Sequence, residues 1–283
     1  MAFRQTLANV ISASGVALHA GTTIHMTLAP AVAGAGIVFR RSDLGVDIPA
    51  RYDVVTETKL GTVIAKHDAS VGVIEHLMAA VAGAGVDDML VTLDGPEPPI
   101  LDGDALSYLK LIGDAGLKSQ STPRRAIKVL KRVEVESGGA RVVLLPADSL
   151  SYEFEIAFPG TAIGEQTFTL GFTRETFARE IAPARTFGFT KEFEALNKMG
   201  LARGASLENT LAVDGDRVVN AGLMRFADEF VRHKILDAVG DMALAGAPLI
   251  ARFQGFKSGH STNNAVLRAL FANPENYAMI ETA

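Results

Sequence analysis

The chain of 283 residues contains no cysteine, and it has no long apolar run. The absence of cysteine excludes disulfides, thiolate nucleophiles, iron–sulfur clusters and cysteine-based zinc sites. The longest apolar stretch, 77–86, is about half of the ~20 residues that a membrane-spanning helix needs. Asn9 and His19 interrupt the apolar segment that an N-terminal signal peptide would require. We therefore expect a cytoplasmic protein without a membrane span.

Positive charge is also scarce. The chain has 27 Lys and Arg against 32 Asp and Glu, a net charge of −5, and no basic block. This balance argues against nucleic acid as a partner. With 48% hydrophobic residues and no low-complexity tract, the sequence is typical of a folded globular protein. At roughly 150 residues per domain, its length predicts about two domains.

Hydrophobic periodicity predicts the strands and helices of the chain. Alternation predicts strands at 23–28, 37–39 and 89–93, and helical spacing predicts helices at 73–82 and 105–115. The polar segment 118–125 contains Pro123 and has no apolar period, which is typical of a linker. The remaining predictions are alternating runs between 127 and 158, helices at 173–181, 191–198 and 223–245, a strand at 249–253 and a helix after His260. We therefore predict domains at 1–122 and 123–283.

An internal echo links the two predicted domains. Each contains a helix that carries a histidine, His76 or His233, followed by an Ala-Gly stop and a strand that ends in glycine. Two halves built on one plan would explain this echo, and chance similarity between alanine-rich helices is the alternative. We predict an α+β fold with two similar domains, each an antiparallel sheet packed against helices, and an active site between them.

The segment RHKILDAVGD carries the strongest local signal for chemistry. His233 and Asp237 are four residues apart, so a helix places both on one face, and Asp241 extends that row. An imidazole and a carboxylate at this spacing suit a shared Zn²⁺. The alternative is a solvated polar face that begins at Glu229.

Glu75 and His76 are adjacent in an almost wholly apolar segment, where isolated ionisable groups are costly to bury. A metal bound by His76, with Glu75 as general base, would compensate them. The alternative is that Glu75 favours the helix N-terminus by its charge and His76 is a satisfied core histidine.

The segment KSGHSTNN places Lys257 and His260 in a loop between a strand and a helix, where anions are often bound. The alternative is a glycine turn with a Ser/Thr cap. A helix N-terminus lowers the pKa of a histidine, so His260 needs a nearby carboxylate to act as a cationic acid, and Asp241 is our candidate. The segment ARTFGF predicts only an ordered loop.

These blocks occur in the order IEHLMAA, ARTFGF, FVRHKILDAVGD, KSGH, together with SGVALHAG and PEPPILDGDA. In that order the chain resembles the UDP-3-O-acyl-N-acetylglucosamine deacetylases, zinc amidases of lipid A biosynthesis. The resemblance implies hydrolysis of the substrate's acetamide, with zinc bound by His76, His233 and Asp237. Fe²⁺ would also suit these ligands.

The resemblance also implies roles for the residues around the metal. It makes Glu75 the general base, His260 a cationic acid or electrostatic stabiliser, Asp241 the carboxylate that orients His260, and Thr186 the hydroxyl that hydrogen-bonds the oxyanion. The implied substrate contacts are Lys234 beside the metal, Lys257 near the nucleotide phosphates, Phe158 at the uracil, and Phe187, Phe193 and Leu207.

A short insert, about 189–213, is implied to form an apolar passage for the acyl chain. Two stretches depart from the family's pattern: Phe158-Pro159-Gly160, and Leu60-Gly61-Thr62, where many members have a cysteine. Two other functions remain as alternatives, a zinc amidohydrolase acting on a different acylated amino sugar and a non-catalytic scaffold. We expect a monomer.

Overall fold

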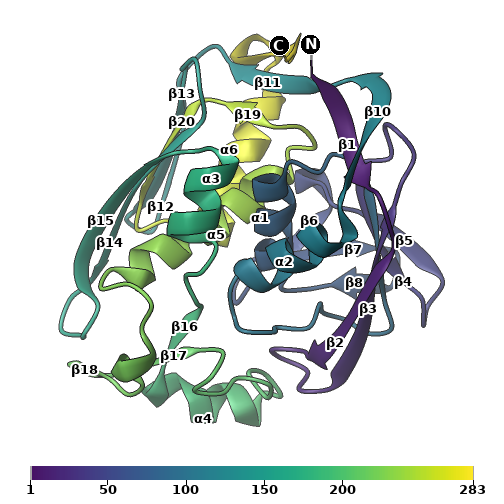
Figure 1. Cartoon of the computed structure of the whole chain (residues 1–283). Helices are drawn as coiled ribbons and strands as arrows, with labels where there is room; N and C mark the ends of the chain where they lie inside the picture. The colour runs from purple at the N-terminus through teal and green to yellow at the C-terminus, as the bar shows by residue number, and fades with distance from the viewer. Residues whose placement is uncertain (1, 283) are drawn as a thin grey trace.

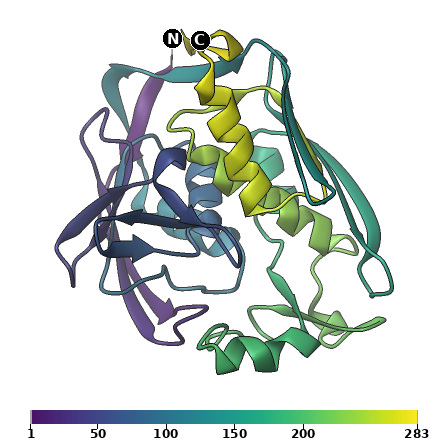
Figure 2. The same ribbon diagram turned by 180° about the vertical axis from the view of Figure 1, so that it is seen from behind.

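The computed structural model describes residues 2–282. Two five-stranded sheets lie on opposite sides of a group of helices (Figure 1), and the view from behind shows the same arrangement (Figure 2). The two ends of the chain lie side by side, with the amide of Ala2 donating to the carbonyl of Thr282 at 3.1 Å. A small sheet with its helix lies at the opposite end of the molecule.

The strands of the first half pair among themselves. They are β1 (Phe3–Leu7), β2 (Ile11–Val16), β3 (Thr23–Pro30), β4 (Ile37–Arg41), β5 (Val46–Pro49), β6 (Val55–Glu57), β7 (Val63–Lys66), β8 (Ala69–Val71), β9 (Met89–Leu93) and β10 (Leu117–Pro123).

The strands of the second half follow the same rule. They are β11 (Arg125–Val129), β12 (Val133–Ser137), β13 (Ala140–Leu145), β14 (Ser151–Phe158), β15 (Gly164–Gly171), β16 (Phe187–Phe189), β17 (Leu211–Asp214), β18 (Arg217–Val218), β19 (Leu249–Ile250), β20 (Arg252–Phe256) and β21 (Tyr277–Glu281).

The helices are α1 (Glu75–Ala84), α2 (Leu106–Ala115), α3 (Arg174–Thr176), α4 (Thr190–Lys198), α5 (Glu229–Ala243) and α6 (His260–Ala272). A π-helical turn, η2 (Phe177–Ile181), continues α3, and short 3₁₀ turns occupy η1 (Tyr52–Val54), η3 (Ala221–Leu223) and η4 (Pro274–Asn276). Among residues 2–282, no helix is both long enough and apolar enough to cross a bilayer.

The two large sheets share one topology. Their strand orders are β2-β3-β9-β4-β5 and β12-β13-β20-β14-β15. The central strand, β9 or β20, comes last in the chain and runs antiparallel to one neighbour and parallel to the other. A helix precedes and another follows each central strand, α1 and α2 in the first half, α5 and α6 in the second. The predicted α+β fold with two similar halves is confirmed, and chance similarity does not explain the echo.

Burial follows from the position of each element. Along β9, Met89, Val91 and Leu93 are fully buried and alternate with half-buried neighbours, as expected for a strand with one face against the core. Helix α1 differs, because nine of its ten residues are buried. A helix that is apolar almost all round lies inside a protein, and α1 lies between the two halves.

One glycine allows α1 and α5 to pack closely. A Cβ atom built on Gly240 of α5 would lie 2.0 Å from the carbonyl oxygen of Glu75, far inside van der Waals contact. Only glycine permits this approach without a shift of backbone. The contact places the first turn of α1 directly against the C-terminal half of α5, about one turn beyond the candidate ligand Asp237.

The structure corrects several predictions. The segment predicted as a linker, 118–125, is mostly strand β10, which pairs antiparallel with β1. Helix α5 begins at Glu229 rather than at 223, and the strand predicted at 249–253 is divided between β19 and β20. The sheets are also not purely antiparallel, since each central strand has a parallel neighbour. Parallel pairing requires a crossover connection, which α1 and α5 supply.

Candidate active site and metal centre

Three buried side chains from α1 and α5 converge between the two halves. His76, His233 and Asp237 each offer a ligand atom, and these atoms lie within 4.8 Å of one another. The Asp237 Oδ1 atom is 3.3 Å from His233 Nε2 and 3.8 Å from His76 Nε2. The three residues are at most 4% exposed. Such a group can hold a metal ion.

The charge states of the three residues fit a divalent cation. Burial, and after it the neighbouring His233, lower the pKa of His76 to about 3. Burial also lowers the pKa of His233, so both imidazoles are neutral and keep a lone pair. Burial acts to raise the pKa of Asp237, but the positive charges around it, that of Lys234 first and that of His260 as well, hold that pKa low. Two neutral nitrogens and one anionic oxygen are a donor set that suits a catalytic metal.

Hydrogen bonds orient two of these ligands. The His233 Nδ1 atom lies 3.1 Å from the carbonyl oxygen of Ala184, which leaves Nε2 for a metal. Lys234 Nζ donates to Asp237 Oδ2 at 2.6 Å, which leaves Oδ1 toward the histidines. His76 Nδ1 is buried and finds no hydrogen-bond partner among residues 2–282, so His76 is not a satisfied core histidine.

His76, His233 and Asp237 are called the metal-type cluster below. Glu75, the first residue of α1, lies next to this cluster and is 4% exposed. Burial raises its pKa to about 7, although the positive charge of His260 acts in the opposite direction. Its Oε1 atom is 3.9 Å from His260 Nε2, and its Oε2 atom accepts the amide of Thr62 at 2.9 Å. A carboxyl group that titrates near neutral pH is suited to accept and release a proton.

His260, the first residue of α6, is paired with Asp241 of α5. The His260 Nδ1 atom is 2.9 Å from Asp241 Oδ2. Burial acts to lower the pKa of His260, but the negative charges of Asp241 and Glu75 outweigh it and raise that pKa to about 9. His260 is therefore a cation at neutral pH, despite its position at a helix N-terminus.

The row of polar residues on α5 is not a solvated face. Glu229, His233, Asp237 and Asp241 are all between 0% and 4% exposed. The alternative interpretation of this row is therefore wrong. Burial of four ionisable groups on one helix is costly unless each has a partner, and every one of them has one here.

A cleft of about 490 Å³ opens onto the cluster. Its lining includes most of the residues predicted to contact substrate, namely Thr186, Lys234, Lys257, Phe158 and Phe187. Phe158 and Phe187 pack edge to face with ring centroids 5.9 Å apart. Phe193 and Leu207 are not part of this lining and lie 44% and 50% exposed on the segment between β16 and β17.

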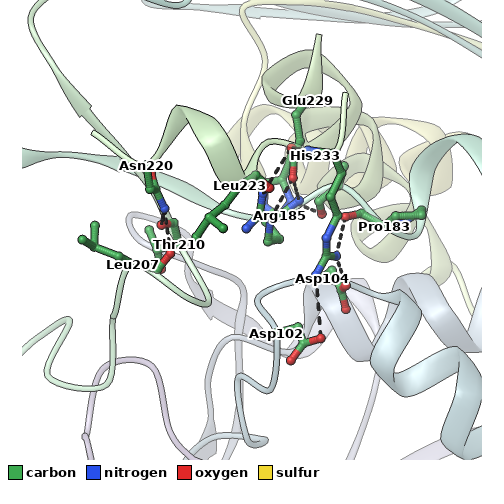
Figure 3. A network of polar contacts seen from close by, with 12 residues as sticks. Asp102, Asp104, Pro183, Arg185, Leu207, Thr210, Asn220, Leu223, Glu229 and His233 are labelled. Carbon is green, nitrogen blue, oxygen red and sulfur yellow. Dashed lines mark hydrogen bonds and ion pairs between the residues drawn. The ribbon is translucent and has the colours of Figure 1, made fainter. Parts of the chain in front are cut away.

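The segment that carries Thr186 is anchored by a buried ion pair. Arg185 Nε donates to Glu229 Oε1 at 3.0 Å, and the Arg185 amide donates to the same oxygen at 3.0 Å. Figure 3 shows this pair beside His233, one helical turn further along α5. Because Ala184 contacts His233 and Thr186 lines the cleft, the ion pair fixes a segment that both orients a candidate ligand and forms part of the cleft.

Arg225 extends this network to the first half. Its amide donates to Glu229 Oε2 at 2.6 Å, and its guanidinium pairs with Asp104 and, at 3.7 Å, with Asp102. Figure 3 labels Glu229 and the two aspartates. Both aspartates follow β9. The network therefore ties the start of α5 to both halves of the molecule.

Sequence reasoning missed several of these residues. Arg185 was placed in an ordered loop without a partner, and Thr62 and Asn263, which both donate to Asp241, carried no role. Thr62 and Asp241 are 179 residues apart, so no local spacing reveals their contact. Asn263 lies in the segment KSGHSTNN, three residues after His260, which was the available signal.

A family comparison agrees with this geometry. The model of the UDP-3-O-acyl N-acetylglycosamine deacetylase family (LpxC) matches residues 4–272. The chain belongs to this family. The match includes both halves of the deacetylase fold and every residue of the metal-type cluster.

Relatives of the deacetylase family match almost the full chain. A UDP-3-O-acyl-N-acetylglucosamine deacetylase of Phenylobacterium zucineum (strain HLK1) is 46% identical over 277 residues, 96% of this chain and 94% of the relative. The protein of the same name from Geotalea uraniireducens (strain Rf4) is 45% identical over 99% of this chain and 92% of the relative. The protein of the same name from Myxococcus xanthus (strain DK1622) is 44% identical over 98% of this chain and 89% of the relative.

Proposed function

We propose that this chain hydrolyses the acetamide of UDP-3-O-acyl-N-acetylglucosamine, releasing acetate and UDP-3-O-acyl-glucosamine for lipid A biosynthesis. The observation that carries the proposal is the buried cluster of His76, His233 and Asp237 with Glu75 and His260 beside it. This constellation combines metal ligands, a base and an acid within one cleft, which is what metal-assisted amide hydrolysis requires.

Zinc is the ion we propose for His76, His233 and Asp237. Imidazole and carboxylate ligands are those of catalytic zinc sites, in which three protein ligands leave one position free. When bound, the ion lowers the pKa of water and polarises the amide carbonyl.

Glu75 acts as the base of the reaction and His260 as the acid. As water attacks the amide carbon, the Glu75 carboxylate accepts its proton. The His260 cation and the Thr186 hydroxyl stabilise negative charge on the carbonyl oxygen, an effect of roughly 3 kcal/mol for a single donor. The C–N bond then breaks as His260 donates its proton to the amine, acetate leaves, and the proton held by Glu75 restores the His260 cation. Before that transfer, Asp241 favours the cationic form of His260.

The cleft provides the substrate contacts of this proposal. Lys234 beside the ligand Asp237 contacts the sugar, and Lys257 at the loop before α6 binds the phosphates. Phe158 stacks on the uracil, and Phe187 packs between Phe158 and the cluster. The acyl chain follows the insert 189–213 in the second domain, 123–283, with Phe193 and Leu207 covering it.

The experiment is acetate release from the UDP-linked substrate by wild type and the Glu75→Gln variant. Glutamine keeps the size of the side chain but cannot accept the proton, so we expect kcat to fall about 100-fold or more with metal content unchanged. Glu281→Gln, at an exposed position of β21, is the matched control and keeps wild-type kcat. Wild-type activity in Glu75→Gln would refute the role of Glu75.

Two further measurements separate the remaining alternatives. Free UDP should compete with the substrate, and a lack of competition would favour a zinc amidohydrolase acting on a different acylated amino sugar. Metal analysis of the purified protein distinguishes zinc from Fe²⁺, which the same ligands suit. A protein that binds no metal and releases no acetate would instead be a scaffold.

A further inference from the structure

Thr62, the residue directly before β7, contacts the carboxylates of both Glu75 and Asp241. Its amide donates to Glu75 Oε2 at 2.9 Å, and its hydroxyl donates to Asp241 Oδ1 at 2.5 Å. Thr62 is 1% exposed, so water does not replace either bond. One residue of the first half therefore holds a group on α1 and a group on α5.

Asp241 is fully engaged by three donors. Besides the Thr62 hydroxyl on Oδ1, its Oδ2 atom accepts Asn263 Nδ2 at 2.9 Å and lies 2.9 Å from His260 Nδ1. Hydrogen bonds to an ionised carboxylate are stronger than neutral ones. Donors on both oxygens fix the rotation of the carboxylate, and the carboxylate in turn directs His260 Nε2 toward Glu75, 3.9 Å away.

The loop before Thr62 is shaped around Glu75. Gly61 has a φ of +143°, and a Cβ atom built there would lie 2.9 Å from Glu75 Oε1. A side chain at this position would displace the carboxylate. The dipeptide Gly61-Thr62 therefore surrounds the Glu75 carboxylate, with the glycine leaving room for one oxygen and the threonine amide holding the other.

We propose that Thr62 is a positioning residue that couples the orientation of Glu75 to that of the Asp241–His260 pair, with Asn263 as the second donor to Asp241. The inference rests on the function proposed for Glu75 and His260. Thr62 and Asn263 do not line the cleft, and neither belongs to the metal-type cluster. Their loss should therefore change the chemical step and leave substrate and metal binding intact.

The first test compares Thr62→Val with Thr62→Ser. Valine keeps the shape but removes the hydroxyl, and serine keeps the hydroxyl. We expect Thr62→Val to lower kcat about tenfold or more, with KM changed less than about twofold, because a hydrogen bond to a charged group is lost. Thr62→Ser should restore kcat to within about threefold of wild type, as expected when the hydroxyl rather than packing is required.

Thr6→Val is the matched control. Thr6 is also buried, and its hydroxyl oxygen accepts the amide of Ala31 at 2.9 Å, remote from the cleft. The Thr6→Val variant loses this part-buried hydrogen bond, so its Tm should fall while its kcat stays unchanged. If Thr62→Val does not fold, Thr62→Ala removes the same hydroxyl without adding a methyl group against Asp241 and is tested in its place.

The second readout does not depend on activity. In protein labelled with ¹⁵N-histidine, the Nδ1–H proton of His260 is assigned by its absence from His260→Gln. Removal of the Thr62 hydroxyl leaves Asp241 with fewer donors, so this resonance should shift in Thr62→Val and in Asn263→Ala, and remain unchanged in Thr6→Val.

The outcomes separate this inference from the proposed function. A wild type that releases no acetate refutes the proposed function, and the histidine resonance then decides whether Thr62 acts on the pair. With an active wild type, an unchanged kcat in Thr62→Val overturns the inference. A loss that Thr62→Ser shares, or one that appears only in KM, also overturns it.

Discussion

At the scale of single residues, the environment of each ionisable group sets its charge. The pKa values of buried Glu75 and half-buried His260, whose Oε1 and Nε2 atoms lie 3.9 Å apart, are shifted in the direction that suits their roles. Burial raises the pKa of Glu75 to about 7, and the charges of Asp241 and Glu75 raise the pKa of His260 to about 9 against the effect of burial. Between these values the base is ionised and the acid is protonated.

Activity should therefore follow a bell-shaped pH profile. It rises as Glu75 loses its proton and falls as His260 loses its own, and a bound divalent cation moves both limbs to lower pH because it disfavours protonated groups nearby. In Asp241→Asn, the anion that favours the His260 cation is removed, so the alkaline limb should move to lower pH. Profiles of kcat/KM measure this, and an alkaline limb that stays in place in Asp241→Asn would contradict the assignment to His260.

At the scale of elements, the contact between α1 and α5 decides the site. His76 is on one helix, and His233 and Asp237 are on the other, so the cluster exists only while the helices stay close. Gly240 permits that distance, since a Cβ atom there would lie 2.0 Å from the Glu75 carbonyl oxygen. The approach of two helices, rather than either helix alone, creates the metal-type cluster.

Gly240→Ala should weaken both metal binding and stability. The added methyl group forces the helices apart, and overpacking of this kind costs about 1–3 kcal/mol of unfolding free energy. Gly113→Ala in α2 is the control, because nothing lies within 4 Å of a Cβ atom there. That change should stabilise the protein by about 0.5–1 kcal/mol. Urea unfolding and metal titration measure both, and wild-type metal affinity in Gly240→Ala would show that the helices tolerate the change.

At the scale of the whole molecule, the metal-type cluster joins the two halves. Its ligands come from α1 in the first half and α5 in the second, and the Arg225 network and Thr62 make further connections between the halves. A ligand that binds only the folded state raises stability by mass action.

Removal of the metal with a chelator should lower Tm, and Zn²⁺ should restore it. An ion present at 1,000 times its Kd contributes about 4 kcal/mol of unfolding free energy. The His76→Ala variant lacks one ligand, so its Tm should respond little to chelator or Zn²⁺. Differential scanning calorimetry measures this, and equal responses of wild type and variant would place the metal elsewhere.

Much of the architecture was present in local patterns. The strand at 89–93 and the helices at 105–115 and 191–198 were predicted within one residue of their bounds, because periodicity reports which face of an element is buried. Strand β10 was missed because it is polar and lies in a two-stranded sheet, where no buried face produces alternation. The domain boundary at 122/123 stays a prediction.

The amino-acid sequence alone establishes which chemical groups are available and which of them share a helix face. The four-residue spacing of His233 and Asp237 requires only a helix, and the lack of cysteine limits the metal ligands to nitrogen and oxygen. Tertiary structure decided what surrounds them: the approach of His76, the burial that shifts each pKa, and the bond from Thr62 to Asp241. These depend on contacts between residues far apart in the chain, and local sequence patterns carry no information about such contacts.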